Sequence, residues 1–405
     1  DGKQIPWDEA MKQFLALLKV SSGAIAYLGK PASGSEGEFI DEWLNSAGGG
    51  ERYKFSLLTQ NSQQEANMIS FGREVIPDYA FENAGIMLNF STEFLEGWGS
   101  SVENARRFTQ AHAYRNGNKK RLIHISPHVS LTGAKSDRWI QIKPGTEGLV
   151  ALAIAFVIRE EKDNYEFLKT YLESYKPEKV AEASGVSAEK IRELAKEVLN
   201  NGPLMALAGG NLIATDQCVE TLTAINILNA VAGALDKTIR FFDQDPSEVA
   251  SHKEVNKLIS DLNSGQIKLL ITDDSNPAYA LPQSMEFIKA MKKAFVVSIA
   301  SQRSETTHEA NLVMPALTAY ESWGDAYPRS GVRSIQQPVM SPVNMFDAKA
   351  REDILLNAVQ KTNQNAFSGI TTYQEYLQNK WRKIHSEIGN SDKFENFWIS
   401  VLENG

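Results

Sequence analysis

The chain has 405 residues, a length that exceeds one ordinary domain and predicts two or three. Its composition, with 42% hydrophobic and 23% charged residues, is typical of a globular protein, and its formal net charge of −8 argues against nucleic acid as the main partner. The longest apolar run, 149–158, is about half of what a bilayer requires, so we interpret it as a buried helix.

Strand-like runs alternate with helical patterns along the chain, which favours a mostly parallel α/β sheet. Helices are predicted at 7–20 and at 188–199, the second with Ser187 as its N-cap. The Gly/Ser/Pro-rich segment 30–38 is more typical of a connecting loop than of a phosphate cradle, because it lacks the Gly-Lys-Ser/Thr of a P-loop. Strands are predicted at 24–29, 54–59, 86–90, 122–126, 139–143, 204–208, 267–272, 295–299 and 311–314.

The single cysteine, Cys218, restricts the redox chemistry of the chain, since one cysteine forms neither an intrachain disulfide nor a cysteine-ligated zinc or iron–sulfur site. Of the six histidines, only His124 and His128 have a spacing typical of metal ligands. Pro127 lies between them and strand residues precede them, so we interpret both as structural histidines.

Polar residues flank the last predicted strand. A Glu-Thr-Thr-His turn at 305–308 precedes it, and Glu321, Gly324, Arg329 and Arg333 follow it in what we interpret as loop sequence. Open α/β sheets build ligand crevices from such residues at strand ends.

Five short segments, in order along the chain, resemble the patterns of one family, the molybdopterin oxidoreductases (the DMSO-reductase family). They are Ile5–Ala10 (IPWDEA), Asp78–Ala84 (DYAFENA), Trp139–Glu147 (WIQIKPGTE), Asp274–Pro277 (DSNP) and Glu305–Pro315 (ETTHEANLVMP). The chain departs from the family patterns with Glu147 for Asp, Asp274 for Gly and Asn311 for Asp.

The resemblance implies a fold and its division into domains. We expect two Rossmann-like parallel-sheet domains, one inserted into the other. The discontinuous domain combines 1–78 with 251–360, the inserted domain is 79–250, and 361–405 forms a C-terminal tail. The family's N-terminal iron–sulfur domain and C-terminal barrel are not expected within this sequence.

The resemblance also implies where a pterin cofactor would lie if the chain retained one. The cofactor-binding candidates are Pro144, Gly145, Thr146, Glu147, Asn276, Pro277, Thr306, His308 and Glu321. Active members bind molybdenum through Ser, Cys, selenocysteine or Asp in the region that matches 57–71, where Ser62 is the one candidate and a turn at a strand end explains it equally well. Two cofactor loops also differ from the family pattern, at 88–92 and at 126–128, so we expect a retained fold without its own cofactor and no catalytic residues.

Segments 94–100 and 321–325 resemble the large periplasmic subunits of alternative complex III and of the quinone reductase complex. This resemblance implies a metal-free, molybdopterin-like subunit of a membrane-bound quinone or quinol:cytochrome electron-transfer complex of the respiratory chain. It would lie peripherally on the periplasmic side of the inner membrane. The expected partners are an iron–sulfur ferredoxin-like subunit or domain, a cytochrome c subunit with its haem, and quinone-binding membrane subunits.

Two alternatives remain open from the sequence. One is a fragment of an active molybdenum bis-pterin oxidoreductase. The other is a nucleotide-binding enzyme, although no Gly-x-Gly-x-x-Gly opens a helix and Ala208-Gly209-Gly210 is the nearest feature. If the chain is instead a subunit of the electron-transfer complex, aromatic and Arg side chains on loops are its expected interface anchors. These are Trp98, Trp323, Tyr327, Arg329 and Arg333.

Overall fold

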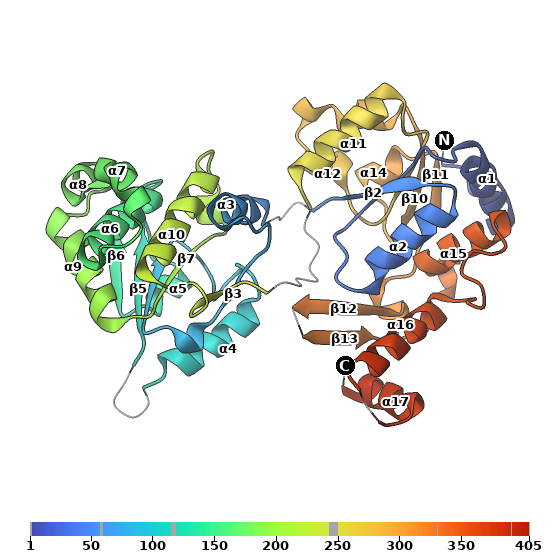
Figure 1. Ribbon diagram of the computed structural model, residues 1–405. Helices are drawn as coiled ribbons and strands as arrows, with labels where there is room; N and C mark the ends of the chain where they lie inside the picture. Colours follow the sequence, from blue (N-terminus) through green and yellow to red (C-terminus); the bar gives the residue numbers. More distant parts are fainter. Residues whose placement is uncertain are drawn as a thin grey trace. The chain divides into compact units, whose positions relative to one another are not determined.

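The computed structural model describes residues 2–56, 60–114, 119–242, 250–329, 331–389 and 391–404. They form two compact units (Figure 1). Unit 1 combines Asp1–Thr59 with Pro246–Gly405, and unit 2 is Gln60–Asp245. The division predicted from sequence placed 60–78 in the discontinuous domain and set 361–405 apart as a tail.

Unit 1 is built around a five-stranded parallel sheet with the strand order β11-β10-β9-β1-β2. The strands are β1 (Ile25–Gly29), β2 (Gly50–Lys54), β9 (Leu269–Thr272), β10 (Phe295–Ala300) and β11 (Leu312–Pro315). Numbered within the unit, this is the 2-1-3-4-5 order of doubly wound folds, and the order reverses between β1 and β9. Both of those strands are buried throughout, as expected for a parallel sheet covered on both faces.

Helices flank this sheet. They are α1 (Trp7–Val20), α2 (Ser35–Ser46), α11 (His252–Ser264), α12 (Pro277–Ala280), α13 (Phe287–Met291), α14 (Glu305–His308), α15 (Arg351–Thr362), α16 (Tyr373–Glu387) and α17 (Phe394–Asn404). The bounds of α1 agree with the prediction, because Ala10, Phe14 and Leu18 recur every four residues and are all buried.

A β-hairpin follows β11, so the loop predicted there is wrong. β12 (Gly324–Arg329) pairs antiparallel with β13 (Val332–Gln336), and Gly331 between them has φ +78°. Ile335 of the hairpin packs with Trp381 of α16 and Trp398 of α17. The hairpin therefore attaches the C-terminal helices to unit 1.

The second strand also differs from its prediction, since β2 ends where the predicted strand 54–59 begins. β2 lies at the edge of the sheet, and only Tyr53 among its residues is buried. Its polar sequence, GERYK, resembles that of an exposed edge rather than a core strand. Residues 57–59 lie outside the described residues.

Unit 2 contains a four-stranded parallel sheet with the order β6-β5-β4-β7. The strands are β4 (Ile86–Phe90), β5 (Arg121–Ser126), β6 (Arg138–Gln141) and β7 (Leu204–Ala208). Within the unit this is the order 3-2-1-4 of the first four strands of a Rossmann fold, with its reversal between β4 and β7. A small antiparallel pair, β3 (Asp78–Tyr79) with β8 (Ile239–Arg240), accompanies it. The predicted α/β class with parallel sheets is confirmed.

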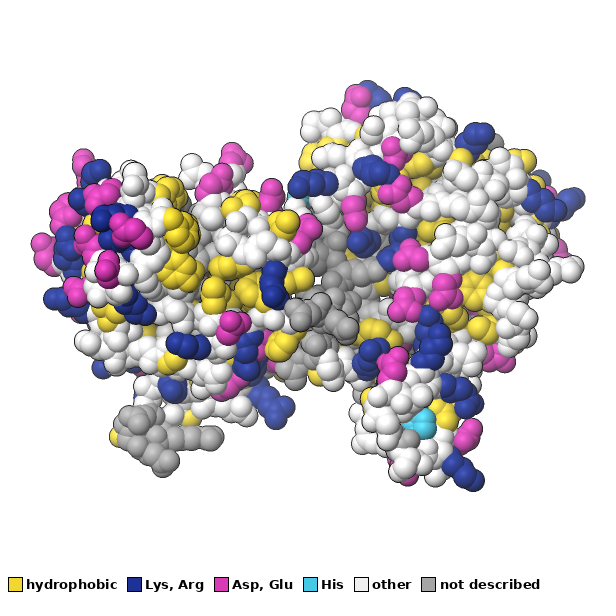
Figure 2. All heavy atoms as spheres, viewed as in Figure 1, with side chains coloured by type: hydrophobic (Ala, Val, Ile, Leu, Met, Phe, Trp, Pro, Cys, Tyr) yellow, Lys and Arg dark blue, Asp and Glu magenta, His cyan; other side chains and the backbone are white. Residues whose placement is uncertain are grey.

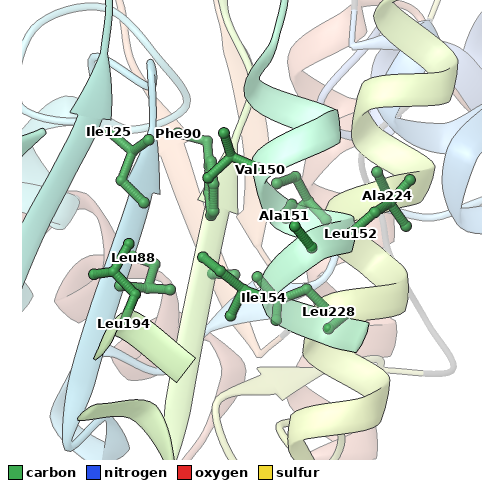
Figure 3. Packing of buried hydrophobic residues seen from close by; sticks show 14 of the residues in the cluster. Leu88, Phe90, Ile125, Val150, Ala151, Leu152, Ile154, Leu194, Ala224 and Leu228 are labelled. Atoms are coloured by element: carbon green, nitrogen blue, oxygen red, sulfur yellow. The ribbon is translucent and has the colours of Figure 1, made fainter. Parts of the chain in front are cut away.

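Helices also flank the sheet of unit 2. They are α3 (Asn61–Phe71), α4 (Ser101–His112), α5 (Leu131–Ala134), α6 (Glu147–Lys162), α7 (Lys169–Leu172), α8 (Pro177–Ser184), α9 (Ala188–Asn201) and α10 (Cys218–Ala232). α6 is buried from Val150 to Arg159, and its side chains pack between the sheet and α10 (Figure 3). This confirms the predicted buried helix. Among the described residues, no helix is long and apolar enough to span a membrane.

Contacts with α10 assign α3 to unit 2. Asn226 of α10 donates hydrogen bonds to Asn67 Oδ1 (2.9 Å) and to Ser70 Oγ (3.2 Å) of α3. Because Asn67 and Asn226 are both buried, these bonds fix α3 against its neighbour. This packing explains why the boundary between the units falls before α3 and not after it.

Candidate functional site

Doubly wound sheets bind ligands outside the carboxyl ends of their strands, at the point where the strand order reverses. Unit 1 has this point between β1 and β9, and unit 2 has it between β4 and β7.

In unit 1, the carboxylate of Asp273 bridges the two strand ends. Its oxygens accept hydrogen bonds from Lys30 N (2.8 Å), directly after β1, and from Ser275 N (2.7 Å), just beyond β9. A Cβ on Gly29 would lie 2.9 Å from Asp273 Oδ2, so the carboxylate packs closely on the end of β1. In a dinucleotide-binding fold, backbone N–H groups at these strand ends face the ligand. Here Lys30 N and Ser275 N donate to the Asp273 side chain instead.

A second carboxylate lies at the N-terminus of α2. Asp325 of β12 accepts hydrogen bonds from Ser35 N (2.7 Å), Ser35 Oγ (2.7 Å) and Trp381 Nε1 (3.1 Å). A Cβ on Gly34 would lie 2.4 Å from the main-chain oxygen of Asp325. Helix N-termini attract anions through their free N–H groups and their dipole. Asp325 therefore occupies the position where a phosphate would bind in a nucleotide fold.

Charged side chains gather beside these strand ends. Arg351 donates hydrogen bonds to Glu36 and to Glu352 Oε1 (2.9 Å), and its Nη1 lies 3.9 Å from Asp273 Oδ2. Three carboxylates thus share one guanidinium. Burial raises the pKa of Glu36 to about 7, the Arg351 guanidinium opposes this shift, and the other two carboxylates add to it. The pKa of Glu36 thus lies above that of an ordinary carboxyl even though the side chain pairs with Arg351.

The structure brings three of the predicted cofactor residues of unit 1 together. Thr306 donates from both N (3.1 Å) and Oγ1 (2.9 Å) to Asn276 Oδ1, and Asn276 Nδ2 donates to Glu305 Oε2 (2.6 Å). Pro277, the first residue of α12, follows Asn276 directly. His308 is exposed at the end of α14, on the same short helix as Thr306.

Glu321, the remaining candidate of unit 1, has a different role. Its carboxylate accepts hydrogen bonds from Thr318 N (3.0 Å), Thr318 Oγ1 (2.8 Å) and Val343 N (2.8 Å). These bonds lower the pKa of Glu321. Within the described residues, no hydrogen bond joins it to the Asn276 and Thr306 pair.

In unit 2, the end of β4 is closed by internal hydrogen bonds. Asn89 donates to Thr92 O (2.8 Å) and to Nδ1 of His124 (2.9 Å), and its Oδ1 accepts from Thr92 N (3.2 Å). All three residues are fully buried. Burial lowers the pKa of His124 to about 4, which keeps the imidazole neutral. Asn89 lies in the strand itself, and its amide is fully used by these neighbours.

The other side of this crevice is covered by an indole. A Cβ on Gly209, directly after β7, would lie 2.1 Å from Trp98 Nε1. Trp98 is 8% exposed and packs with Phe94, Met205 and Leu207 in a hydrophobic core. The glycine therefore makes room for a side chain of the same chain. Trp98 is a core residue and not an exposed interface anchor.

The Pro-Gly-Thr-Glu segment of unit 2 forms the start of α6. Gly145 has φ +77°, and Thr146 Oγ1 donates to Lys143 O (2.6 Å). Glu147 is 2% exposed and accepts a hydrogen bond from Ser91 Oγ (2.8 Å). Ser91 itself has φ +56°, which is uncommon for a residue other than glycine. Glu147 thus binds the segment after β4.

Ser62, the one metal-ligand candidate, lies in the first turn of α3 and not in a turn at a strand end as the alternative reading expected. Burial raises the pKa of the thiol of Cys218, the first residue of α10, and the Ser62 side chain opposes this shift. In the part of the chain that the structure describes, no three His, Cys, Asp or Glu residues are placed to hold a metal ion.

The remaining predicted interface anchors have mixed surroundings. Trp323 is half-buried and stacks on Trp398 at 6.4 Å between ring centroids. The exposed Arg333 guanidinium lies 4.3 Å from the ring centroid of Tyr327. The side chain of Arg329 lies outside what the structure describes.

Sequence reasoning missed three side chains that dominate the crevice of unit 1, which are Asp273, Asp325 and Arg351. Asp273 had a signal, because a carboxylate directly after a buried strand lies at the ligand edge of a parallel sheet. Asp325 and Arg351 had none, since a hairpin and a distant helix bring them to this edge.

Comparison with known proteins gives one matching family model, "molybdopterin oxidoreductase", over residues 3–357. A curated relative, the "menaquinone reductase, molybdopterin-binding-like subunit" of Nitratidesulfovibrio vulgaris, is 24% identical over 402 aligned positions, 93% of this chain and 57% of the relative. The "probable oxidoreductase YoaE" of Bacillus subtilis is 25% identical over 56% of this chain and 38% of its own length. The chain thus spans about half the length, or less, of these relatives.

Among solved structures, acetylene hydratase from Pelobacter acetylenicus has a similar fold. Its TM-score is 0.69 at 15% sequence identity, over 89% of this chain and 58% of that chain. At that identity the similarity concerns the fold alone.

Proposed function

The chain belongs to the molybdopterin oxidoreductase family, and from this membership we propose that it is a molybdopterin-like subunit without a metal cofactor of its own. We place it in a membrane-bound quinone or quinol:cytochrome electron-transfer complex, peripheral on the periplasmic side of the inner membrane. Its proposed partners are an iron–sulfur ferredoxin-like subunit or domain, a haem-bearing cytochrome c subunit and quinone-binding membrane subunits.

One observation carries the cofactor-free part of this proposal, namely that the chain's own side chains fill the strand-end positions of both units. Asp273 and Asp325 use the backbone donors at the end of β1 and at the start of α2. Trp98 covers Gly209 at the end of β7. A pyrophosphate needs open backbone and positive charge at such positions. The residues present therefore do not fit the phosphates of a pterin dinucleotide.

One named relative supports the proposed membership in a complex. A menaquinone reductase subunit described as molybdopterin-binding-like joins this family to quinone chemistry. The single Cys218 agrees with a chain that carries no iron–sulfur cluster, since such clusters take four protein ligands. In the proposed complex, electrons pass through centres held by the partners, and this chain provides a scaffold beside them.

Metal and pterin analysis of the purified complex tests the proposal. We expect molybdenum far below one atom per chain, no pterin fluorescence after acid oxidation, and iron and haem in the same sample. An active molybdenum enzyme purified from the same cells is the control for cofactor loss. Roughly one molybdenum per chain would favour the alternative, a fragment of an active molybdenum bis-pterin oxidoreductase, with Ser62 as the first ligand to examine.

A further inference from the structure

A groove of about 680 Å³ runs along unit 1 between α1 and α15, which lie side by side (Figure 1). Trp7, Met11 and Leu15 of α1 and Ile354 of α15 contribute apolar surface to it. Trp7 is held in place by a hydrogen bond from its Nε1 to Asp347 O (2.6 Å). The groove thus has an apolar floor between two packed helices.

Four exposed lysines line the groove. They are Lys12, Lys19, Lys349 and Lys361. Within the described residues, none of their ammonium groups forms an ion pair, although the Lys349 ammonium lies 4.5 Å from the centroid of the Trp7 ring. On the face shown in Figure 2, Lys and Arg side chains stand at the edge of unit 1 where α1 lies in Figure 1.

Two carboxylates, Asp8 and Asp353, also line the groove, so lysines outnumber acidic side chains there. Asp353 is already engaged, because its Oδ1 accepts a hydrogen bond from Tyr373 N (2.7 Å). This local excess of positive charge occurs on a chain whose net charge is −8. The groove is therefore complementary to a negatively charged ligand with an apolar side.

We propose that this groove binds an acidic amphipathic helix of a partner protein. Two packed helices with an apolar floor between them form a typical receptor for a third helix. Lys12 and Lys19 are seven residues apart, about 10 Å along the helix axis, and match carboxylates seven residues apart on the ligand. Apolar residues between those carboxylates would face Met11 and Leu15.

The shape of the groove favours a helix over a lipid surface. Membrane-binding helices present their apolar residues outward, where these can enter the headgroup region. Here the apolar side chains form a floor and the lysines form the rim. The inference rests on the charge and shape of unit 1 alone, and it holds whether or not the chain binds a cofactor.

Titration of the full chain with a labelled synthetic peptide tests this inference. The probe is a helix of about 18 residues with Leu and Met on one face and Glu at two positions seven apart. A second peptide with Lys in place of each Glu is its control. We expect saturable binding of the acidic peptide, binding of the basic peptide at least about tenfold weaker, and weaker binding at higher salt.

Variants of the chain separate groove binding from general charge attraction. Lys12→Glu with Lys19→Glu should weaken binding about tenfold. Lys196→Glu with Lys383→Glu changes the net charge equally at exposed helix positions outside the groove, and should bind within about twofold of the unmodified chain. Ala16→Trp fills the groove from an exposed position and should abolish binding while the circular dichroism spectrum stays unchanged.

Four results would overturn the proposal. The acidic peptide fails to bind, or it binds all variants equally. Vesicles containing phosphatidylglycerol bind the chain and displace the peptide, which would identify a lipid surface as the occupant. Sedimentation shows a dimer that Ala16→Trp dissociates, which would identify a second copy of the chain.

Discussion

His124 shows how a residue type that is typical of metal sites becomes structural in this fold. Its side chain is fully buried in β5, where the Asn89 amide donates to Nδ1. An imidazolium would place a second donor opposite that amide, so the neutral form is favoured in addition to the effect of burial. The interpretation of this histidine as structural rested on Pro127 and on the strand residues before it, whereas the structure supplies the physical reason.

This environment predicts a pH dependence of stability. The pKa of His124 is about 4 in the folded chain and about 6.5 when unfolded, so the unfolded state binds a proton first as the pH falls. Stability is therefore lost between about pH 6.5 and 4, by up to about 3 kcal/mol. Urea midpoints of His124→Gln should change less across this range, while the exposed His252→Gln should follow the unmodified chain. Equal pH slopes for all three proteins would contradict this assignment.

Gly209 and Trp98 should behave as one unit. Gly209→Ala places a Cβ within 2.1 Å of the indole nitrogen, and we expect a loss of about 2–3 kcal/mol. Trp98→Ala removes a core side chain and should cost about 3–5 kcal/mol. With the indole gone, the added methyl group has space. The loss of stability in the double variant should therefore be smaller than the sum of the two single losses by about 1 kcal/mol or more.

Chemical denaturation of the four proteins in this cycle provides the measurement. Gly97→Ala controls for the added methyl group alone, because its Cβ would meet no atom within 4 Å; the strain of a side chain at Gly209, where φ is +154°, is common to both Gly209 variants and cancels in the cycle. It should change stability by no more than about 0.5 kcal/mol. Strict additivity of the two substitutions at Gly209 and Trp98 would mean that the indole does not fill this crevice.

At the scale of elements, the hairpin β12–β13 and α2 depend on one another through Asp325. Asp325→Asn keeps the size of the side chain and removes the charge that faces the helix N-terminus. We expect a loss of about 1–2 kcal/mol in the free energy of unfolding and a change in the fluorescence of Trp381, whose indole loses a charged acceptor. Glu387→Gln, at an exposed position of α16, is the control and should have little effect. An unchanged denaturation midpoint for Asp325→Asn would show that its contact with α2 contributes little.

The sequence predicts buried strands better than exposed ones. The bounds of β4 and β7 agree with the prediction, because each is a short, fully buried apolar run. β2 was not predicted correctly because it is an edge strand with polar residues. The strand was predicted instead at the more apolar residues that follow it. The hairpin β12–β13 was not predicted because Gly324 and Pro328 weaken a strand pattern, although the Ser-Gly pair in the sequence before Val332 was an available signal.

The candidate site was predictable to a similar extent. Local motifs gave Asn276 and Thr306, which the structure joins by hydrogen bonds, because each follows a buried strand of the same parallel sheet. Of the carboxylates that fill the crevice, Asp273 had a signal as the residue directly after a buried strand, but Asp325 had none. Asp325 reaches Ser35 across 290 positions of sequence, and only the paired hairpin brings it there.

At the scale of the whole molecule, unit 2 should fold by itself. It has its own parallel sheet, and α6 and α10 cover a continuous core within it. Residues 60–242 expressed alone should give a cooperative thermal transition and a helical circular dichroism spectrum. Residues 60–201, which lack β7 and α10, are the control and should be unfolded. A fragment 60–242 that resembles this control would show that unit 2 depends on unit 1.

The pairing of β1 has a consequence for biosynthesis. Ile25 of β1 pairs with Leu269 of β9, so about 240 residues, including all of unit 2, are translated between the two strands. At about 5–20 residues per second, β9 leaves the ribosome roughly 12–50 s after β1. During this interval the nascent β1 has an open edge, and its face with Ala26 and Leu28 lacks the later helices α11 and α13 that cover it, while unit 2 has time to fold. We therefore expect a holding chaperone to bind the amino-terminal strands of the newborn chain, and to be needed during synthesis more than by the finished protein.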